Sequence, residues 1–200
     1  MMPAAYQEFL RKIPEDGRLR LVQLYHAVRN IPYGAAGVRD PVKVIENNAG
    51  SCSGKHLLLR DLLWAENYET EVITIYTHFN KEVPLHESYP DELARMIRKE
   101  IVYDFHHYVR ARIDGSWLRL DATWHDPLAP YGFPVNKEWD ATGDTILAAK
   151  PLRTYADVPD VATLKQELIA SLSPEEREKR ARFFTLLTGW IASLPQGGGR

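Results

Sequence analysis

The chain contains one cysteine, Cys52, and its surroundings are typical of a helix N-terminus. Ser51 is a good N-cap residue, and the segment 52–67 carries leucines at helical spacing. A cysteine in the first turn of a helix lies among free backbone N–H groups at the positive end of the helix dipole. Both features favour the thiolate, which is the nucleophilic form of cysteine. Cys52 is therefore a candidate nucleophile, and the alternative is a buried structural thiol.

A β-hairpin is expected to supply the partners of such a nucleophile. Asp114-Gly115 separates two runs of alternating residues and is the strongest short hairpin signal in the sequence. A two-residue turn pairs Ile113 with Ser116, and this pair fixes the register of both strands. Because side chains alternate between the faces of a strand, one face is then apolar: Val109, Ala111, Ile113, Leu118, Leu120 and Ala122.

The opposite face of the hairpin carries groups suited to acid–base chemistry. In this register His106 and Asp121 are diagonal neighbours within side-chain reach, whereas His107 points to the apolar side. A turn one residue longer would reverse the faces, but it would set Leu118 and Leu120 against arginines. With Cys52, the pair can form a catalytic triad in which His106 is the base and Asp121 orients it.

Three stretches of the sequence carry a family resemblance: RLRLVQLYHAVRNIPYG, DPVKVIENNAGSCSGKHLLLRDLL and HHYVRARIDGSWLRLDATW. Over about residues 19–126 they resemble the core of the transglutaminase-like superfamily of papain-like cysteine enzymes. The run 50–52, Gly-Ser-Cys, matches the family's Gly-x-Cys at a helix start. Aligned on the turn 113–115 and Trp117, His106 and Asp121 fall on the family's catalytic histidine and aspartate.

The sequence departs from the family pattern beside two of these groups. The Ala-Trp that usually follows the histidine is His107-Tyr108, and the proline that usually follows the aspartate is Ala122. Neither departure changes a catalytic group, so the resemblance implies a cysteine-nucleophile acyl-transfer enzyme that acts on an amide or ester through a thioester.

The fate of that thioester is open, because water completes hydrolysis whereas an amine completes transamidation. We expect a hydrolase of the amidase or peptidase type, since no calcium loop or additional domain is visible; the alternative is a transamidating acyltransferase. The backbone N–H of Cys52 can stabilise the oxyanion. The second donor is open among five candidates: Gln23, Tyr33, Asn47, Asn48 and His107.

Two non-catalytic interpretations compete with the triad. Cys52 and His56 are four residues apart on the expected helix and, with the adjacent His106 and His107, could ligate zinc. No second cysteine or HExxH pairing supports this site, and we expect no metal and no cofactor. The other interpretation is a binding domain that keeps the fold without activity. Three arginines on the triad face are expected either to recognise an anionic substrate or, more commonly, to form cross-strand ion pairs: Arg110, Arg112 and Arg119.

The helices and strands expected around Cys52, His106 and Asp121 indicate an α+β, papain-like fold. A helix that carries the nucleophile packs on an antiparallel sheet, and extra helices follow at the C-terminal end. Helices are expected over 19–29, from Asp40-Pro41 to Ile45, over 52–67 and over 91–100. The C-terminal extension over about 155–194 is expected to contain one or two amphipathic helices, with a fresh start at Pro174. Strands are expected over 71–79 and in the hairpin, and a loop over 84–90.

The composition limits the class of protein and its partners. With 200 residues, of which 44% are hydrophobic and 26% charged, we expect one domain over 1–194 and a flexible tail over 195–200. The net charge of −2 offers no basic field for nucleic acid. No apolar run approaches the roughly 20 residues of a membrane span, and no signal peptide is visible. We therefore expect a cytoplasmic protein whose partner is a small-molecule, peptide or protein acyl substrate, with no nucleic acid and no membrane.

Overall fold

A computed structural model describes residues 2–14, 17–34, 39–156, 158 and 160–195 of the chain. Four strands form one antiparallel sheet in the order β3-β2-β1-β4: β1 (Thr70–His78), β2 (Tyr103–Ile113), β3 (Ser116–Leu120) and β4 (Arg153–Tyr155). The described helices are α1 (Ala4–Arg11), α2 (Gly17–Arg29), α3 (Pro41–Glu46), α4 (Cys52–Ala65), α5 (Asp91–Lys99), α6 (Val161–Ala170) and α7 (Pro174–Ser193), with short 3-10 turns η1 (Phe79–Lys81) and η2 (Asp126–Tyr131). The chain is thus α+β, as expected.

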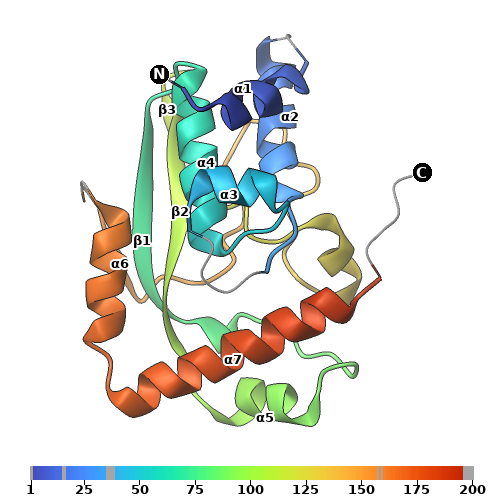
Figure 1. Ribbon diagram of the computed structural model, residues 1–200, viewed down its shortest axis with the longest axis vertical. Coiled ribbons are helices and arrows are strands. Elements are labelled where there is room, and N and C mark those ends of the chain that lie inside the picture. Colours follow the sequence, from blue (N-terminus) through green and yellow to red (C-terminus); the bar gives the residue numbers. More distant parts are fainter. Residues whose placement is uncertain (1, 15–16, 35–38, 157, 159, 196–200) are drawn as a thin grey trace.

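The helix that begins at the cysteine is the centre of the fold. The Ser51 hydroxyl accepts a hydrogen bond from the amide of Gly54 at 3.3 Å, so the predicted N-cap is confirmed. α4 lies against β1 and β2, and α2 and α3 pack against α4 in turn (Figure 1). Its fully buried leucines meet the apolar face of the hairpin in one hydrophobic core: Leu58, Leu59, Leu62 and Leu63.

The register of the β2–β3 hairpin is the one predicted from the turn. Ile113 pairs with Ser116 and Val109 with Leu120, so Asp114-Gly115 forms a two-residue turn. Both turn residues have positive φ, at 49° for Asp114 and 83° for Gly115, as a type I′ turn requires. The predicted apolar face is therefore correct, and its residues join the core around α4.

The sequence pattern predicted that the strand after the turn continues to Trp124, but β3 ends earlier. β3 ends at Leu120 because the next three backbone N–H groups bind side chains instead of the ladder. The amide of Asp121 donates to Thr145 Oγ1 at 2.7 Å, that of Ala122 to His56 Nε2 at 2.8 Å, and that of Thr123 to Asp121 Oδ1 at 3.0 Å. The departure from the sheet brings Asp121 Oδ1 to 3.5 Å from Nε2 of His56 on α4.

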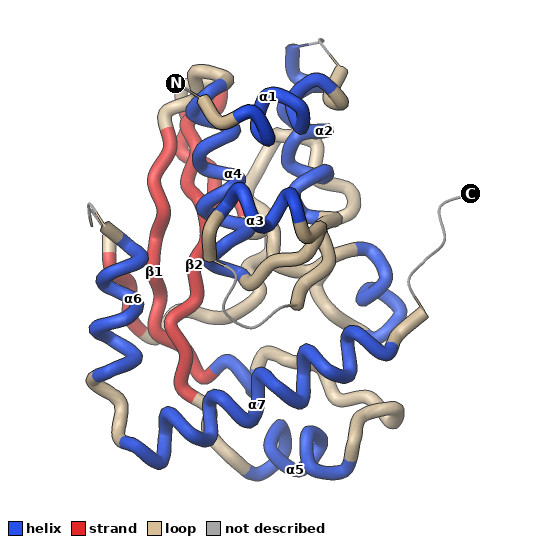
Figure 2. The backbone as a smooth tube through the Cα atoms, in the orientation of Figure 1, coloured by secondary structure: helices blue, strands red, loops and turns tan. Residues whose placement is uncertain are grey.

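A second group of helices encloses the other end of the sheet. Figure 2 shows α1 to α4 gathered beside the upper parts of β1 and β2, while α7 and α5 cross below and α6 stands beside β1. α7 starts at Pro174, as predicted, with a capping box formed by Ser173 and Glu176. Its buried residues join the core that contains Cys52 and Phe79.

Two regions differ from the sequence expectations or lie beyond them. α1 is a helix that the periodicity analysis did not predict, and it buries Tyr6 and Leu10. Of the expected flexible tail over 195–200, residues 196–200 lie outside the described residues. Among the described helices, none combines the length and apolar character that crossing a membrane needs.

Candidate active site

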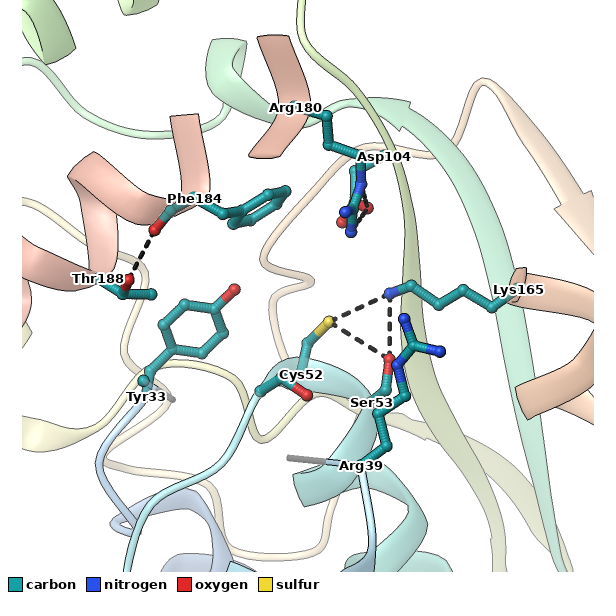
Figure 3. Close-up of a pocket in the computed structure, with 11 residues that line it drawn as sticks. Tyr33, Arg39, Cys52, Ser53, Asp104, Lys165, Arg180, Phe184 and Thr188 are labelled. Carbon is teal, nitrogen blue, oxygen red and sulfur yellow. Dashed lines mark hydrogen bonds and ion pairs between the residues drawn. The ribbon is translucent and has the colours of Figure 1, made fainter. Parts of the chain in front are cut away.

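Cys52 opens onto a small cavity of about 100 Å³ between the first turn of α4, the start of β2 and helices α6 and α7. Figure 3 shows the side chains that reach it from these separate elements. The walls carry an unusual density of charge for so small a space: Arg39, Asp104, Lys165 and Arg180 line it with the thiol and with Tyr33.

Gly50 allows the nucleophile to approach Tyr33. A Cβ at this position would lie 3.0 Å from side-chain atoms of both Val44 and Lys55, so a larger residue would force them apart. The backbone of Gly50 pairs with that of Tyr33 in a parallel bridge. The Gly-Ser-Cys run therefore joins two requirements, a close backbone approach and a capped helix start.

His106 and Asp121 form the contact that the hairpin register predicted. His106 Nε2 lies 2.8 Å from Asp121 Oδ2, and both side chains are almost fully buried. No partner with hydrogen-bond geometry is found for His106 Nδ1 among the described residues, and this is the nitrogen left for the thiol. The Asp121 carboxylate and, to a smaller extent, the neighbouring Cys52 raise the pKa of His106.

Backbone amides fix the aspartate in its orientation. Asp121 Oδ2 accepts from the amide of Ala148 at 2.8 Å in addition to His106, and Oδ1 accepts from the amide of Thr123 at 3.0 Å. Burial works against the ionised form, but the His106 imidazolium and hydrogen bonds hold the pKa of Asp121 well below its ordinary value. The carboxylate therefore stays charged and cannot rotate away from His106.

His56 connects the backbone of Cys52 with that of Ala122, the residue after Asp121. Its Nδ1 lies 2.8 Å from the Cys52 carbonyl oxygen, and its Nε2 accepts from the amide of Ala122. A carbonyl only accepts and an amide only donates, so the ring is neutral with its proton on Nδ1. Both nitrogens are thus occupied, which argues against the zinc site considered from the sequence. The described residues contain no group of three or more His, Cys, Asp or Glu arranged for a metal ion.

Four charged residues of the cavity were not predicted from the sequence: Arg39, Asp104, Lys165 and Arg180. Of these, Lys165 contacts the Cys52 sulfur. It comes from α6, is only 3% exposed, and places its ammonium 3.6 Å from Cys52 Sγ and 3.0 Å from Ser53 Oγ. In Figure 3 these contacts form a triangle at the floor of the cavity. In the sequence, Lys165 sits within an ordinary amphipathic helix pattern, so no local signal marks it.

The charges around Cys52 favour a thiolate paired with an imidazolium. Burial alone would raise the pKa of the thiol, but the Lys165 ammonium and His106 outweigh it and lower that pKa to about 6. Burial would likewise lower the pKa of His106, yet the Asp121 carboxylate and Cys52 raise it to about 10. Between these two values the sulfur is negative and the imidazole positive, which is the reactive state of a cysteine nucleophile.

Of the five candidates for a second oxyanion donor, the structure brings one to the cavity. Tyr33 lines it, and its hydroxyl is turned toward the space beside Cys52 (Figure 3). Burial and the nearby Cys52 charge raise its pKa well above the ordinary value, so the hydroxyl remains a donor.

The structure brings none of the other four candidates to the cavity. Asn47 and Asn48 lie exposed at the C-terminal end of α3, because they terminate that helix rather than face the nucleophile. Gln23 is exposed on α2 beside a different surface hollow. His107 is fully buried, and the register of β2 turns its side chain away from that of His106.

The three arginines on the triad face of the hairpin are occupied by carboxylates. Arg110 pairs with Glu71 at 3.3 Å, Arg112 with Glu69 at 3.2 Å and Arg119 with Asp144 at 2.8 Å. These pairs are the cross-strand and surface contacts that the commoner interpretation predicted. None of the three arginines lines the cavity beside Cys52.

Comparisons with known proteins add little to this geometry. No protein-family model matches the sequence, and no curated protein does. Among solved structures, the chain is similar to one described as a "Putative Cysteine Protease from Cytophaga hutchinsonii", at 18% sequence identity and a TM-score of 0.42. The similarity covers 78% of this chain and 53% of that one, so the chain spans about half its length. A likeness this loose carries no argument about activity, and the chemistry follows from the cavity residues themselves.

Replacing Lys165 by methionine should make the thiol less acidic. Lys165→Met removes the cation 3.6 Å from the sulfur while keeping a side chain of similar length. We expect the midpoint of the pH–rate profile for alkylation of Cys52 by iodoacetamide to rise from about pH 6 by about 1 to 2 pH units. Lys150→Met, at an exposed position outside the cavity, is the matched control and should leave the profile unchanged. An unchanged midpoint in folded Lys165→Met would exclude this role.

Proposed function

We propose that this protein is a cysteine-nucleophile enzyme with a papain-like, transglutaminase-like core, which cleaves an amide or ester through a thioester. The observation that carries the proposal is the His106–Asp121 pair at 2.8 Å, with the free nitrogen of His106 coupled to a cysteine at a helix N-terminus. A buried structural thiol has no need of an ion-paired imidazole or a lysine beside it.

The first half-reaction uses the ion pair that already exists. The Cys52 thiolate attacks the carbonyl carbon and forms a carbon–sulfur bond, while the carbonyl electron pair moves to oxygen. The His106 imidazolium then gives its proton to the leaving nitrogen or oxygen, and the bond from carbon to that atom breaks. The products are a thioester on Cys52, the free amine or alcohol, and a neutral His106.

The second half-reaction restores the ion pair. Neutral His106 accepts a proton from water as the water oxygen attacks the thioester carbonyl, and Asp121 stabilises the imidazolium that forms. Collapse of the tetrahedral intermediate breaks the carbon–sulfur bond and releases the acid and the thiolate. We propose water as the acceptor, and competition with an added amine tests this choice.

The transient oxyanion needs donors that are fixed before the reaction begins. The amide of Cys52 is one, since the first N–H groups of a helix have no partner within it. The Tyr33 hydroxyl is the other, kept protonated by its raised pKa and held by packing on Trp124 at a ring distance of 4.9 Å. Donors placed in this way act where the charge develops.

Trapping the thioester tests the proposal directly. The protein is mixed with p-nitrophenyl acetate, and the intact mass is followed with time. We expect one acetyl group on Cys52, released by hydroxylamine, and no such adduct on Cys52→Ser. Acetylation of Cys52 no faster than that of free cysteine would overturn the proposal. Methylamine added in the same assay separates the acceptors, because a transamidating enzyme forms N-methylacetamide and a hydrolase forms acetate.

The adjacent histidines provide an internal control for the base. His106→Ala removes the proton carrier and should lower turnover by about 100- to 10,000-fold. His107→Ala should keep measurable turnover and lower stability by about 1 to 3 kcal/mol, because the truncation leaves a cavity at a fully buried position. Turnover and melting temperature are measured for both. If His107→Ala abolished turnover while His106→Ala spared it, the assignment of the base would be wrong.

A further inference from the structure

We infer that the cavity selects acyl donors whose leaving group carries a free carboxylate next to the scissile nitrogen, as in an N-acyl amino acid or the C-terminal residue of a peptide. The inference rests on the proposed function and names the substrate class for the same site. It follows from side chains that the acyl-transfer steps do not use: Arg39, Asp104 and Arg180.

The walls of the cavity have an excess of positive charge. Three cations, Arg39, Lys165 and Arg180, face one carboxylate, Asp104. The Cys52 thiolate reduces this excess before the reaction, and formation of the thioester removes that negative charge. A substrate with an anionic group near the reacting carbonyl is therefore favoured over a neutral or cationic one.

Two of the three cations keep unused donors. Lys165 is engaged with Cys52 and Ser53. Arg180 gives both Nε and Nη2 to one oxygen, Asp104 Oδ1, at 2.8 and 2.6 Å, and within the described residues no hydrogen bond is found for its Nη1. Arg39 forms no hydrogen bond or ion pair in the described part of the chain. Figure 3 shows Arg39 and Arg180 reaching the cavity from opposite sides. Guanidinium N–H groups match the geometry of a carboxylate.

The buried carboxylate of Asp104 calls for a hydrogen-bond donor from the bound substrate. The side chain is 1% exposed, and no partner is found for Oδ2 among the described residues. Burial would raise its pKa, but Arg180 and Lys165 hold that pKa well below its ordinary value, so the carboxyl group is ionised and can only accept. A buried acceptor without a partner is costly. In a substrate with an amide N–H adjacent to a carboxylate, the N–H can donate to Asp104 Oδ2. The carboxylate can accept from Arg39 and from Nη1 of Arg180.

A matched pair of reagents tests this recognition without a known substrate. Chloroacetylglycine and chloroacetylglycinamide differ only in a carboxylate and a carboxamide. With either reagent the Cys52 sulfur forms a bond to the carbon that carries chlorine, the carbon–chlorine bond breaks and chloride leaves. The quantity measured is the ratio of the two alkylation rates, acid over amide, divided by the same ratio for free cysteine.

We expect this normalised ratio to be about 10 for the protein, because one charge-assisted hydrogen bond to the carboxylate changes the rate by about that factor. Arg39→Met should lower it several-fold, and it should not affect folding because Arg39 is partly exposed and unpaired within the described chain. Arg112→Met removes the same charge from the distant hairpin and should leave the ratio unchanged. Arg180→Met is combined with Asp104→Asn, since either change alone leaves a charge unpaired at a buried site. The double variant should also lower the ratio.

The outcomes separate this inference from the proposed function. A ratio near one that Arg39→Met does not change, with rapid alkylation by the amide reagent, would overturn the inference and leave the nucleophile intact. Alkylation by both reagents no faster than that of free cysteine would overturn the proposed function and the inference with it. A tenfold ratio that Arg39→Met and the double variant both reduce supports the inference.

Discussion

A negative charge on a buried sulfur is the constraint on which the arrangement of this protein depends. Cys52 is 4% exposed, and an ion in such a place is unstable unless nearby charges and dipoles compensate it. Three elements meet for that purpose: the N-terminus of α4, His106 on β2 and Lys165 on α6. Each of the three adds to the stability of the thiolate, so its reactivity depends on the packing of distant parts of the chain.

The end of β3 shows how the backbone serves this constraint. A strand that continued past Leu120 would keep Asp121 in the ladder. Instead, side chains take the backbone amides of residues 121–123, and Lys55 donates to the carbonyl of Thr123 at 2.9 Å. His56 connects this segment to the first turn of α4. The aspartate and the nucleophile are therefore joined through hydrogen bonds as well as through the core, which keeps His106 between them.

Much of this site could be predicted from local signals in the sequence. Ser51 before Cys52 marks a capped helix, and the two-residue turn at Asp114-Gly115 fixes which face of the hairpin carries His106. Both are short-range features whose physics is complete within a few residues. The register also shows which of the two adjacent histidines faces Asp121, because neighbouring residues of a strand point to opposite faces of the sheet.

The rest could not be predicted because it depends on contacts between distant segments. Lys165 reaches Cys52 across 113 positions of the chain, and nothing in the pattern of α6 distinguishes it from a surface lysine. Asn47 and Asn48 suggested hydrogen-bond donors near the cysteine by proximity in sequence, whereas the turn after α3 leaves them exposed. The premature end of β3 has the same origin, since His56 and Thr145 are far from it in sequence.

The ionisation of the only thiol in the chain tests this account most directly. Ultraviolet absorbance reports the thiolate, and the difference between the protein and Cys52→Ser isolates Cys52 as the pH is varied. The account predicts a rise in absorbance centred at about pH 6, with the thiolate already predominant at neutral pH. A rise centred near the free-cysteine value of about 8.5, in protein that remains folded, would contradict it.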